Sequence, residues 1–194
     1  VGAMKGAIFS VDPDTRLVDI THDITPGAIQ EAAFVLAQSY PCFPDDSVHI
    51  VVVDPGVGGP RKPILVSTEK HFFVAPDNGV LSYVFQREEV YGAWELNEDQ
   101  FFRKPVSEVF HGRDIFGPVG AWLFKGIDSA RFGTPITEWV TFPIPTPAEV
   151  RPQAWKGAIL HVDRFGNLIT NLTTKEVPLE AEKRPAAIKA ITKS

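Results

Sequence analysis

The sequence predicts an α/β fold, in which an N-terminal α/β domain with a largely parallel central sheet is followed by a small C-terminal β domain. Short apolar runs rich in β-branched residues alternate along residues 1–142 with segments whose apolar residues recur at helical spacing. Residues 143–152 are dense in proline, which is typical of an extended linker. The expected domains are therefore residues 1–142 and residues 153–194.

The first half of the N-terminal domain is expected to contain two helices and two strands. Residues 1–11 carry small and apolar side chains at helical spacing, and residues 17–20 are a short apolar run that predicts a strand. A second helix is expected from residue 25 until Pro41 ends it. Residues 48–53 follow as a run of mostly β-branched side chains, which is typical of a strand buried on both faces.

The second half continues the alternation. Residues 64–67 and 71–74 predict two strands around a polar turn, and residues 80–85 predict a helix. A further strand is expected at 89–96, and apolar residues line one side of a helix expected at 114–124.

Composition excludes several classes of function. The chain has 194 residues, 44% of them hydrophobic, and a formal net charge of −5, so it can bury a core but lacks the basic balance of a nucleic-acid-binding protein. No apolar run is long enough to span a membrane. The single cysteine, Cys42, cannot form an intrachain disulfide, which favours a reducing, cytoplasmic setting. It has no Cys-His motif around it and is interpreted as a small buried thiol.

A glycine-rich turn follows the strand expected at 48–53. Asp54 ends that strand, glycines stand at positions 56, 58 and 59, and Arg61 comes close enough in sequence to fold back onto Asp54. Open α/β sheets bind ligands outside the carboxyl ends of their strands. Asp54 is therefore either a carboxylate that faces a ligand or a cap of its own turn. The turn matches neither a P-loop nor the dinucleotide fingerprint.

A histidine shortly before the last helix is the second candidate. Histidine titrates near neutral pH and can accept or return a proton, but taken alone His111 is better interpreted as a structural loop histidine. Arg113 and Asp114 are interpreted as a structural pair or a helix cap. The histidines, at positions 22, 49, 71, 111 and 161, show neither HxH nor HxxxH spacing, so no metal site is expected.

The C-terminal part contains one polar turn between two expected strands, residues 157–163 and 168–170. Asp163, Phe165 and Asn167 form either a tight turn capped by the aspartate or a patch of nucleoside size. In the second case the phenylalanine would stack on a base or cover a sulfonium, and the aspartate and asparagine would bond polar edges.

Together these residues resemble the S-adenosyl-L-methionine (SAM) hydroxide adenosyltransferases, the adenosine-forming SAM hydrolases related to the bacterial fluorinase and chlorinase. The matching segments occur in family order along nearly the whole chain. They are Met4-Lys5-Gly6, Val18-Asp19-Ile20-Thr21-His22, Val52-Val53-Asp54-Pro55-Gly56-Val57-Gly58, Pro76-Asp77-Asn78-Gly79-Val80-Leu81, Phe110-His111-Gly112-Arg113-Asp114-Ile115-Phe116 and Asp163-Arg164-Phe165-Gly166-Asn167-Leu168-Ile169-Thr170-Asn171.

The resemblance implies hydrolysis of SAM to adenosine and L-methionine by attack of activated water or hydroxide at the ribose C5′, without a cofactor. Asp54, Arg61 and His111 would position and activate the water, and either Asp54 or His111 would be the base. Substrate-binding positions carried over from the family are Val57, Asn78, Phe110, Gly112, Asp163, Phe165 and Asn167. The resemblance also implies a homotrimer with active sites between subunits, and no nucleic-acid or membrane partner.

Two other functions remain open from the sequence. One is a SAM-dependent halogenase that forms a 5′-halo-adenosine, and the other is a non-catalytic protein that binds adenosine or SAM. In the halogenase relatives the positions of Asp54 and His111 look aromatic. Because a fixed carboxylate repels a halide, these two residues favour water as the nucleophile.

The resemblance also shows departures from the family. Family members begin with a strand that ends in Thr-Asp-Phe-Gly, and their C-terminal domain is longer. We therefore expect natural sequence, including further ligand-binding residues, before Val1 and beyond Ser194. Residues 153–194 are too few to hold a core alone, so this β domain is expected to dock on another surface. Val109 stands where a threonine is expected.

Overall fold

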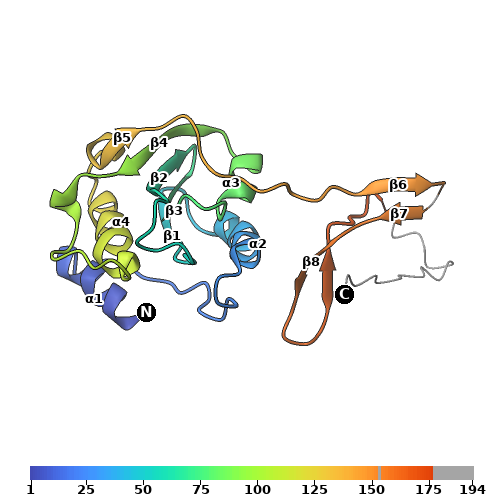
Figure 1. Ribbon diagram of the computed structural model, residues 1–194, viewed down its shortest axis with the longest axis horizontal. Helices are drawn as coiled ribbons and strands as arrows, with labels where there is room; N and C mark the ends of the chain where they lie inside the picture. The colour runs from blue at the N-terminus through green and yellow to red at the C-terminus, as the bar shows by residue number, and fades with distance from the viewer. Residues whose placement is uncertain (153, 177–194) are drawn as a thin grey trace. The chain divides into compact units, whose positions relative to one another are not determined.

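The computed structural model describes residues 1–152 and 154–176 (Figure 1). Contacts divide the chain into two compact units, Val1–Pro143 and Ile144–Ser194, and each is described by itself. The first unit contains a five-stranded sheet with helices, and the second contains two-stranded sheets. Among the described residues, no helix combines the length and the apolar character needed to cross a bilayer.

The sheet of the first unit is mixed. Its order is β1-β3-β2-β4-β5, formed by β1 (Ser47–Ile50), β2 (Pro63–Thr68), β3 (His71–Pro76), β4 (Val90–Leu96) and β5 (Gly133–Pro135). The β1–β3 pair is parallel, and the other pairs are antiparallel. The α/β class is confirmed, but the expectation of a largely parallel sheet is met only by the β1–β3 pair. Only Glu69 and Lys70 separate β2 from β3, and a parallel connection needs a crossover of a dozen or more residues.

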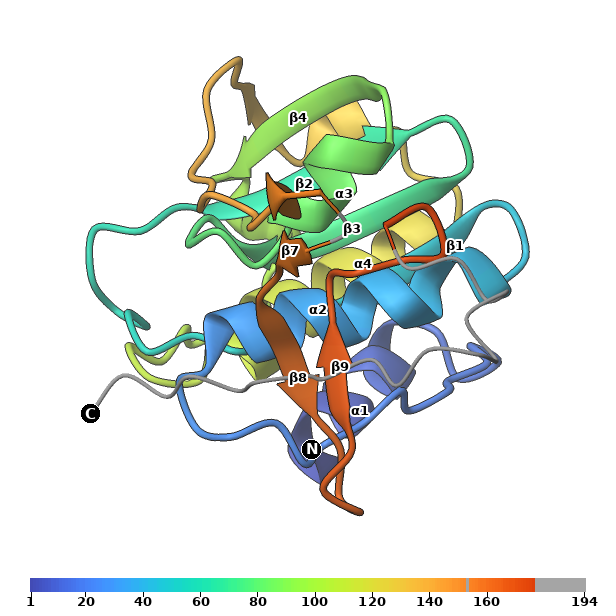
Figure 2. The same ribbon diagram turned by 90° about the vertical axis from the view of Figure 1, so that its right-hand side faces the viewer.

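Helices cover both faces of this sheet (Figures 1 and 2). They are α1 (Gly2–Val11), α2 (Ile29–Ser39), α3 (Ser82–Arg87) and α4 (Gly117–Phe124). Ile64 and Val66 of β2 face the core under α2 and α3, whereas Leu65 faces the core under α4. This alternation follows from the two-residue period of a strand, and it explains why Ile64, Leu65 and Val66 form an unbroken apolar run.

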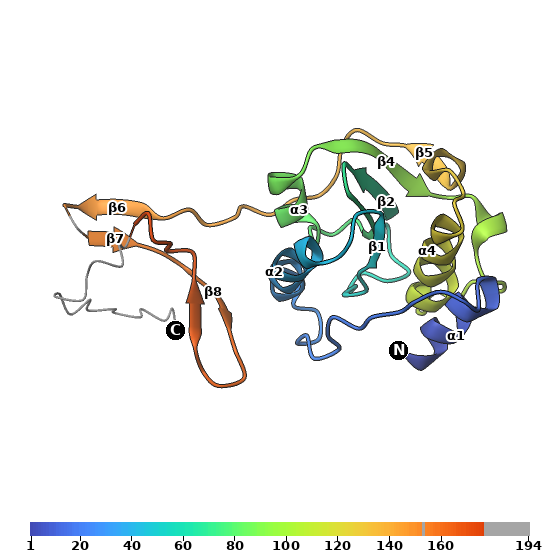
Figure 3. The ribbon, with the colours of Figure 1, turned by 180° about the vertical axis from the view of Figure 1, so that it is seen from behind.

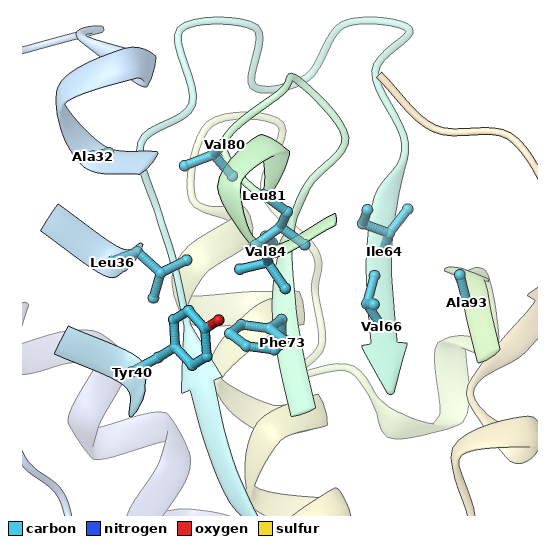
Figure 4. Close-up of a cluster of buried hydrophobic side chains, with 11 residues drawn as sticks. Ala32, Leu36, Tyr40, Ile64, Val66, Phe73, Val80, Leu81, Val84 and Ala93 are labelled. Atoms are coloured by element: carbon cyan, nitrogen blue, oxygen red, sulfur yellow. The ribbon is translucent and has the colours of Figure 1, made fainter. Parts of the chain in front are cut away.

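The core under α2 and α3 is closely packed around aromatic rings (Figure 4). The rings of Tyr40 and Phe73 meet edge to face with centroids 5.3 Å apart, and both residues are buried. Leu36 of α2 and Val84 of α3 belong to the same cluster. This packing fixes β3, which in turn holds β1 by parallel pairing.

The predicted helices at 1–11, 25–40, 80–85 and 114–124 are present with shifted ends, and the last begins as a π-helix. Shorter helical segments are η1 (Tyr40–Cys42), η2 (Asp99–Phe101), η3 (Gly112–Phe116, the π-helix) and η4 (Ser129–Arg131). Cys42 is exposed, contrary to expectation, because Tyr40 occupies the buried position of η1.

The strand predicted at 17–20 is not formed. This segment is assigned neither helix nor strand, and Val18 is 70% exposed. An isolated extended segment is not stabilised by ladder hydrogen bonds, so apolar residues alone do not make it a strand. The strand predicted at 48–53 is also shorter, because β1 ends at Ile50, although the Val51 N–H still donates to the Val74 carbonyl at 3.0 Å.

The second unit is made of antiparallel pairs (Figure 3). Strand β6 (Ala148–Arg151) pairs with β7 (Ala154–Lys156), and β8 (Ile159–Val162) pairs with β9 (Leu168–Thr170). The strand predicted at 168–170 is β9, and the one predicted at 157–163 is the shorter β8. Strand β6 lies inside residues 143–152, which the sequence predicted as linker, because an extended chain can pair with a neighbouring strand where its N–H groups are free of proline.

Candidate active site

The chain leaves β1 and reaches Asp54 at the start of a glycine-rich turn, residues 54–61, here called the Asp54 turn. The Asn78 side-chain amide donates to the Val53 carbonyl at 2.9 Å and so anchors the backbone just before Asp54. Gly58 has φ +74°, and a Cβ there would lie 2.5 Å from the Glu108 carbonyl oxygen. Glycine is therefore required at position 58 for two reasons: its φ is positive, and the loop that contains Glu108 lies too close for a side chain.

Arg61 lies between the other two candidate catalytic residues. Its Nε donates to Asp54 Oδ1 at 3.0 Å, its Nη2 donates to Asp54 Oδ2, and Nη2 also contacts His111 Nδ1 at 2.7 Å. The Arg61 and Asp54 side chains are only 9% and 4% exposed. The guanidinium also lies over the ring of Phe116, 5.4 Å from its centroid, so it is held on several sides.

The contact with Arg61 fixes the tautomer of His111. A guanidinium has donors only, so Nδ1 of His111 must accept the hydrogen bond and the ring proton of the neutral imidazole lies on Nε2. Burial, and then the charge of Arg61, lower the pKa of His111 below its ordinary 6.5, against weaker opposing effects of Asp54 and Asp114. The arrangement therefore favours a neutral His111 that offers an N–H from Nε2.

The loop before the π-helix places an aromatic ring beside this histidine. Phe110 is 57% exposed, and the Arg113 guanidinium lies 5.0 Å from its ring centroid. A Cβ on Gly112 would lie 3.0 Å from Val52 Cγ1, so the π-helix approaches the end of β1 closely at this glycine. The structure thus brings the Phe110-His111-Gly112 segment to the part of the chain that follows β1 and carries Asp54.

Two of the candidate substrate-binding residues, Val57 and Asn78, lie in the Asp54 turn or bond the backbone beside it. Val57 is half-buried within the Asp54 turn. Asn78 uses both ends of its amide on the backbone, since its oxygen accepts from the Val80 N–H at 3.1 Å while its nitrogen bonds Val53. In this chain Asn78 therefore holds the backbone just before Asp54.

Asp163, Phe165 and Asn167 lie in the second unit and form a capped turn. Asp163 Oδ1 accepts from the Phe165 and Asn167 N–H groups at 2.9 and 2.8 Å, and Oδ2 accepts from the Asn167 side chain at 2.7 Å. The Asn167 side-chain bond is the main reason that the pKa of Asp163 is lowered. The cap leaves Phe165 84% exposed, so its ring is free to stack on a flat or cationic group.

Sequence reasoning missed one support of the site, Phe116. The other, Asp114, was interpreted as part of a structural pair with Arg113 or as a helix cap, and the pair is confirmed. Phe116 is fully buried beneath Arg61, and Asp114 is a fully buried carboxylate beneath the loop that carries Phe110. A phenylalanine in an apolar helix gives no signal that distinguishes it from an ordinary core residue. The complete burial of Asp114 was not predicted, and the adjacent Arg113 was the available signal, since charges are rarely fully buried unless paired.

The described residues hold no group of three His, Cys, Asp or Glu side chains placed to bind a metal ion. His49 and His71 are close, with Nε2 and Nδ1 3.4 Å apart, but both are buried among aromatic rings. The polar groups that converge at the end of β1 are instead one carboxylate, one guanidinium and one imidazole. Such a set can orient water and stabilise developing hydroxide.

Comparisons with known proteins agree with this chemistry. Residues 1–133 match the family described as SAM hydroxide adenosyltransferase N-terminal domain. The chain is 39% identical over 166 residues to an (R)-S-adenosyl-L-methionine hydrolase of Salinispora tropica, covering 84% of this chain and 63% of that protein. It is 40% identical over 126 residues to the hydrolase of the same name from Methanocaldococcus jannaschii, covering 62% of this chain and 46% of that protein.

More distant and structural relatives complete the comparison. A fluorinase of Actinoplanes sp. is 23% identical over 188 residues. An uncharacterized conserved protein from Thermotoga maritima superposes with a TM-score of 0.86 at 36% identity, covering 91% of this chain and 69% of that one. The chain spans less than two thirds of the length of the curated hydrolases named above. The resemblance read from the sequence is confirmed, and the chain belongs to the SAM hydroxide adenosyltransferase family, whose N-terminal domain it contains.

Proposed function

We propose that the complete protein hydrolyses SAM to adenosine and L-methionine. The observation that carries this proposal is the contact of Arg61 with both Asp54 and His111 at the end of β1. The names of the curated relatives, (R)-S-adenosyl-L-methionine hydrolases, support it. The proposal concerns the whole protein, because the chain covers 63% of the Salinispora relative.

The chemistry of the substrate explains why so few groups suffice. SAM is a sulfonium, so when the C5′–S bond breaks, its electron pair leaves with sulfur as the neutral thioether of methionine. The water oxygen forms the new C5′–O bond and loses one proton, which gives adenosine, methionine and a proton. No metal or redox cofactor takes part in this balance. The site has mainly to hold the water in line with the breaking bond.

Each of the three residues has a role that its contacts permit. The Asp54 carboxylate retains free lone pairs beside the two bonds from Arg61, so it can accept a hydrogen bond from the water and receive its proton. Arg61 orients this carboxylate through its two hydrogen bonds. Because His111 accepts from Arg61 through Nδ1, it donates from Nε2 to the water oxygen and stabilises its developing negative charge.

The ligand is bound by residues around this centre. Phe110 offers an exposed ring to the adenosyl group, and Val57 and Gly112 border the Asp54 turn and the π-helix. Asp163, Phe165 and Asn167 would come from the C-terminal unit of a neighbouring subunit in a homotrimer. The single cysteine of the sequence favours a reducing, cytoplasmic setting, and the formal net charge of −5 argues against a nucleic-acid partner. No membrane partner is proposed.

Water is the nucleophile that fits the charge of the site. A halide has to be stripped of water and held by neutral donors, but Asp54 would meet it with a buried negative charge. Incubation of the complete protein with SAM, with and without chloride or fluoride, followed by chromatography, separates the alternatives. We expect adenosine at a rate independent of halide.

A 5′-halo-adenosine that forms only with halide would identify a halogenase, and tight binding without turnover would identify a binding protein. Asp54→Asn should abolish most turnover while adenosine still binds, whereas the exposed Asp14→Asn serves as a control with unchanged turnover.

A further inference from the structure

A buried carboxylate behind the candidate site has no role in the proposed reaction. Asp114 is 0% exposed, yet its Oδ1 and Oδ2 accept from Arg113 Nε and Nη2 at 2.6 and 2.7 Å. Arg113 is the principal cause that lowers the pKa of Asp114. A carboxylate is rarely buried completely unless it is paired, so the hydrogen bonds of Asp114 indicate which groups it holds in place.

Asp114 ties down the loop of residues 103–110, here called the Phe110 loop. Its Oδ2 accepts from the Ser107 N–H at 2.9 Å, and its backbone carbonyl accepts from the Arg103 N–H at 2.8 Å. Its own N–H donates to the Phe110 carbonyl at 3.0 Å. One residue of the π-helix therefore fixes the start, the middle and the end of this loop.

Arg113 connects Asp114 to the exposed ring of Phe110. The two parallel bonds to Asp114 set the plane of the guanidinium, which lies 5.0 Å from the centroid of the Phe110 ring. A guanidinium in a fixed plane stacks on a ring, which an ammonium cannot do in the same way. The orientation of Phe110 thus depends on the Arg113–Asp114 pair.

The Phe110 loop also borders the Asp54 turn. A Cβ on Gly58 would lie only 2.5 Å from the Glu108 carbonyl oxygen, so the two loops are in close contact. His111 follows the Phe110 loop directly and meets Arg61 through Nδ1. A shift of the loop would therefore change both the stacking ring and the imidazole contact.

We propose that Asp114 and Arg113 are positioning residues, which hold Phe110 for the adenosyl group and His111 against Arg61. The proposal rests on the proposed function, because it takes the adenosyl group as the partner of Phe110. A merely structural anchor would instead affect the amount of folded protein and leave each folded site unchanged.

The test compares Arg113→Lys and Asp114→Asn with the native residues in the complete protein. Arg113→Lys keeps the charge but loses the planar stacking and one of the parallel bonds, so we expect KM for SAM and the Kd of adenosine to rise about tenfold. Asp114→Asn should also lower kcat and move the acid limb of kcat to lower pH, because the Asp114 charge raises the pKa of His111. Asp128→Asn is the control, since this carboxylate likewise accepts a backbone N–H, from Ala130 at 2.8 Å, away from the site.

The readouts separate the outcomes. A loss of thermal stability with unchanged KM, unchanged adenosine Kd and unchanged kcat per folded site would overturn the proposal. Arg113 is 28% exposed, so Arg113→Lys decides the matter even if Asp114→Asn does not fold. If the native protein binds adenosine but does not cleave SAM, a weaker adenosine affinity in Arg113→Lys still supports the positioning role. If it does not bind adenosine at all, both proposals fail.

Discussion

Arg61 makes the contacts that unite the candidate site. It bonds both oxygens of Asp54 and the Nδ1 of His111, and its guanidinium rests over Phe116. The planar fork of a guanidinium allows these contacts at the same time, whereas a lysine offers a single charged point on a flexible stem. The positions of these side chains therefore show how the three candidate residues act together, which the residue types alone do not show.

Arg61→Lys tests that dependence. We expect kcat to fall about a hundredfold, because the lysine leaves either Asp54 or His111 misplaced. Arg131→Lys is the matched control, since Arg131 also lies over an aromatic ring, 6.0 Å from the centroid of Phe101, but outside the site. Steady-state rates of adenosine formation give the comparison, and a kcat of Arg61→Lys equal to that of the control would contradict the role of the fork.

The pH dependence of activity tests the state of His111. Its folded pKa is lowered, and protonation places a hydrogen on Nδ1 where Arg61 already donates. We expect kcat/KM to be constant above pH 6.5 and to fall only as the pH drops below that ordinary value. Rates measured across this range show the limb directly. A limb centred above pH 6.5 would mean that a different group controls the reaction.

The sequence predicted a set of site residues but not how they contact one another. Asp54, Arg61 and His111 could be grouped because their segments match the family pattern in order. That Arg61 bridges the other two, and that Asn78 bonds backbone groups, depends on side-chain positions that a linear pattern does not encode.

At the scale of elements, two loops and a π-helix hold the site. The Asp54 turn contacts the Phe110 loop at Gly58, and η3 begins directly after His111. A π-helix is often found at functional sites, and here its wider turn places Asp114 and Phe116 beneath the two loops. The sequence predicted a helix in this region, but apolar periodicity does not distinguish a π-helical start from an α-helical one.

Gly58→Ala tests the contact between the loops. A Cβ at this position meets the Glu108 carbonyl at 2.5 Å in addition to the strain of φ +74°. We expect kcat/KM to fall more than tenfold, since the loops must separate and move Asp54 away from His111. Gly126→Ala shares the strain, with φ +86°, but meets nothing within 4 Å. Equal effects of the two variants on catalysis would show that strain alone matters.

The strand directions show where sequence reasoning failed at this scale. Each strand of the pair β2 and β3 was found, but an alternation of strands and helices was taken to mean parallel pairing. The short turn at Glu69 and Lys70 indicates antiparallel pairing instead, because two strands joined by two residues form a hairpin. The β6–β7 pair was missed because prolines dominate its surroundings.

At the scale of the whole molecule, the core that fixes β1 contains ionisable groups. His49 lies against His71, whose environment also includes Glu88, Asp45, Asp46 and Lys70, and Tyr40 bonds Glu88 at 2.6 Å. Burial lowers the pKa of His49 to about 4 and also lowers the pKa of His71. The folded core therefore holds both histidines in the neutral form.

Stability should consequently fall in mild acid. Below pH 6.5 these histidines bind protons in the unfolded chain but stay neutral in the folded core. For His49 this difference between the two states persists down to about pH 4. We expect a loss on the order of 3 kcal/mol from His49 across that window, with a further loss from His71. Urea unfolding at several pH values measures it. His49→Phe should flatten the curve, while His22→Gln, at an exposed histidine, should not. A stability independent of pH across the window would contradict this account.

The proposed trimer can be tested by mixing two inactive proteins. If each site combines Asp54 of one subunit with Phe165 of its neighbour, trimers reassembled from Asp54→Asn and Phe165→Ala subunits contain some intact sites. Phe165 is 84% exposed, so its truncation should not disturb folding. We expect activity to reappear on mixing, and its absence in a stable mixed trimer would place each site within one subunit.

Hydrolysis of SAM in water enriched in oxygen-18 shows whether water attacks C5′. We expect the native protein to yield adenosine whose 5′-oxygen carries the heavy isotope, as measured by mass spectrometry. Adenosine that lacks the label, or a 5′-halo-adenosine formed in its place, would contradict this expectation.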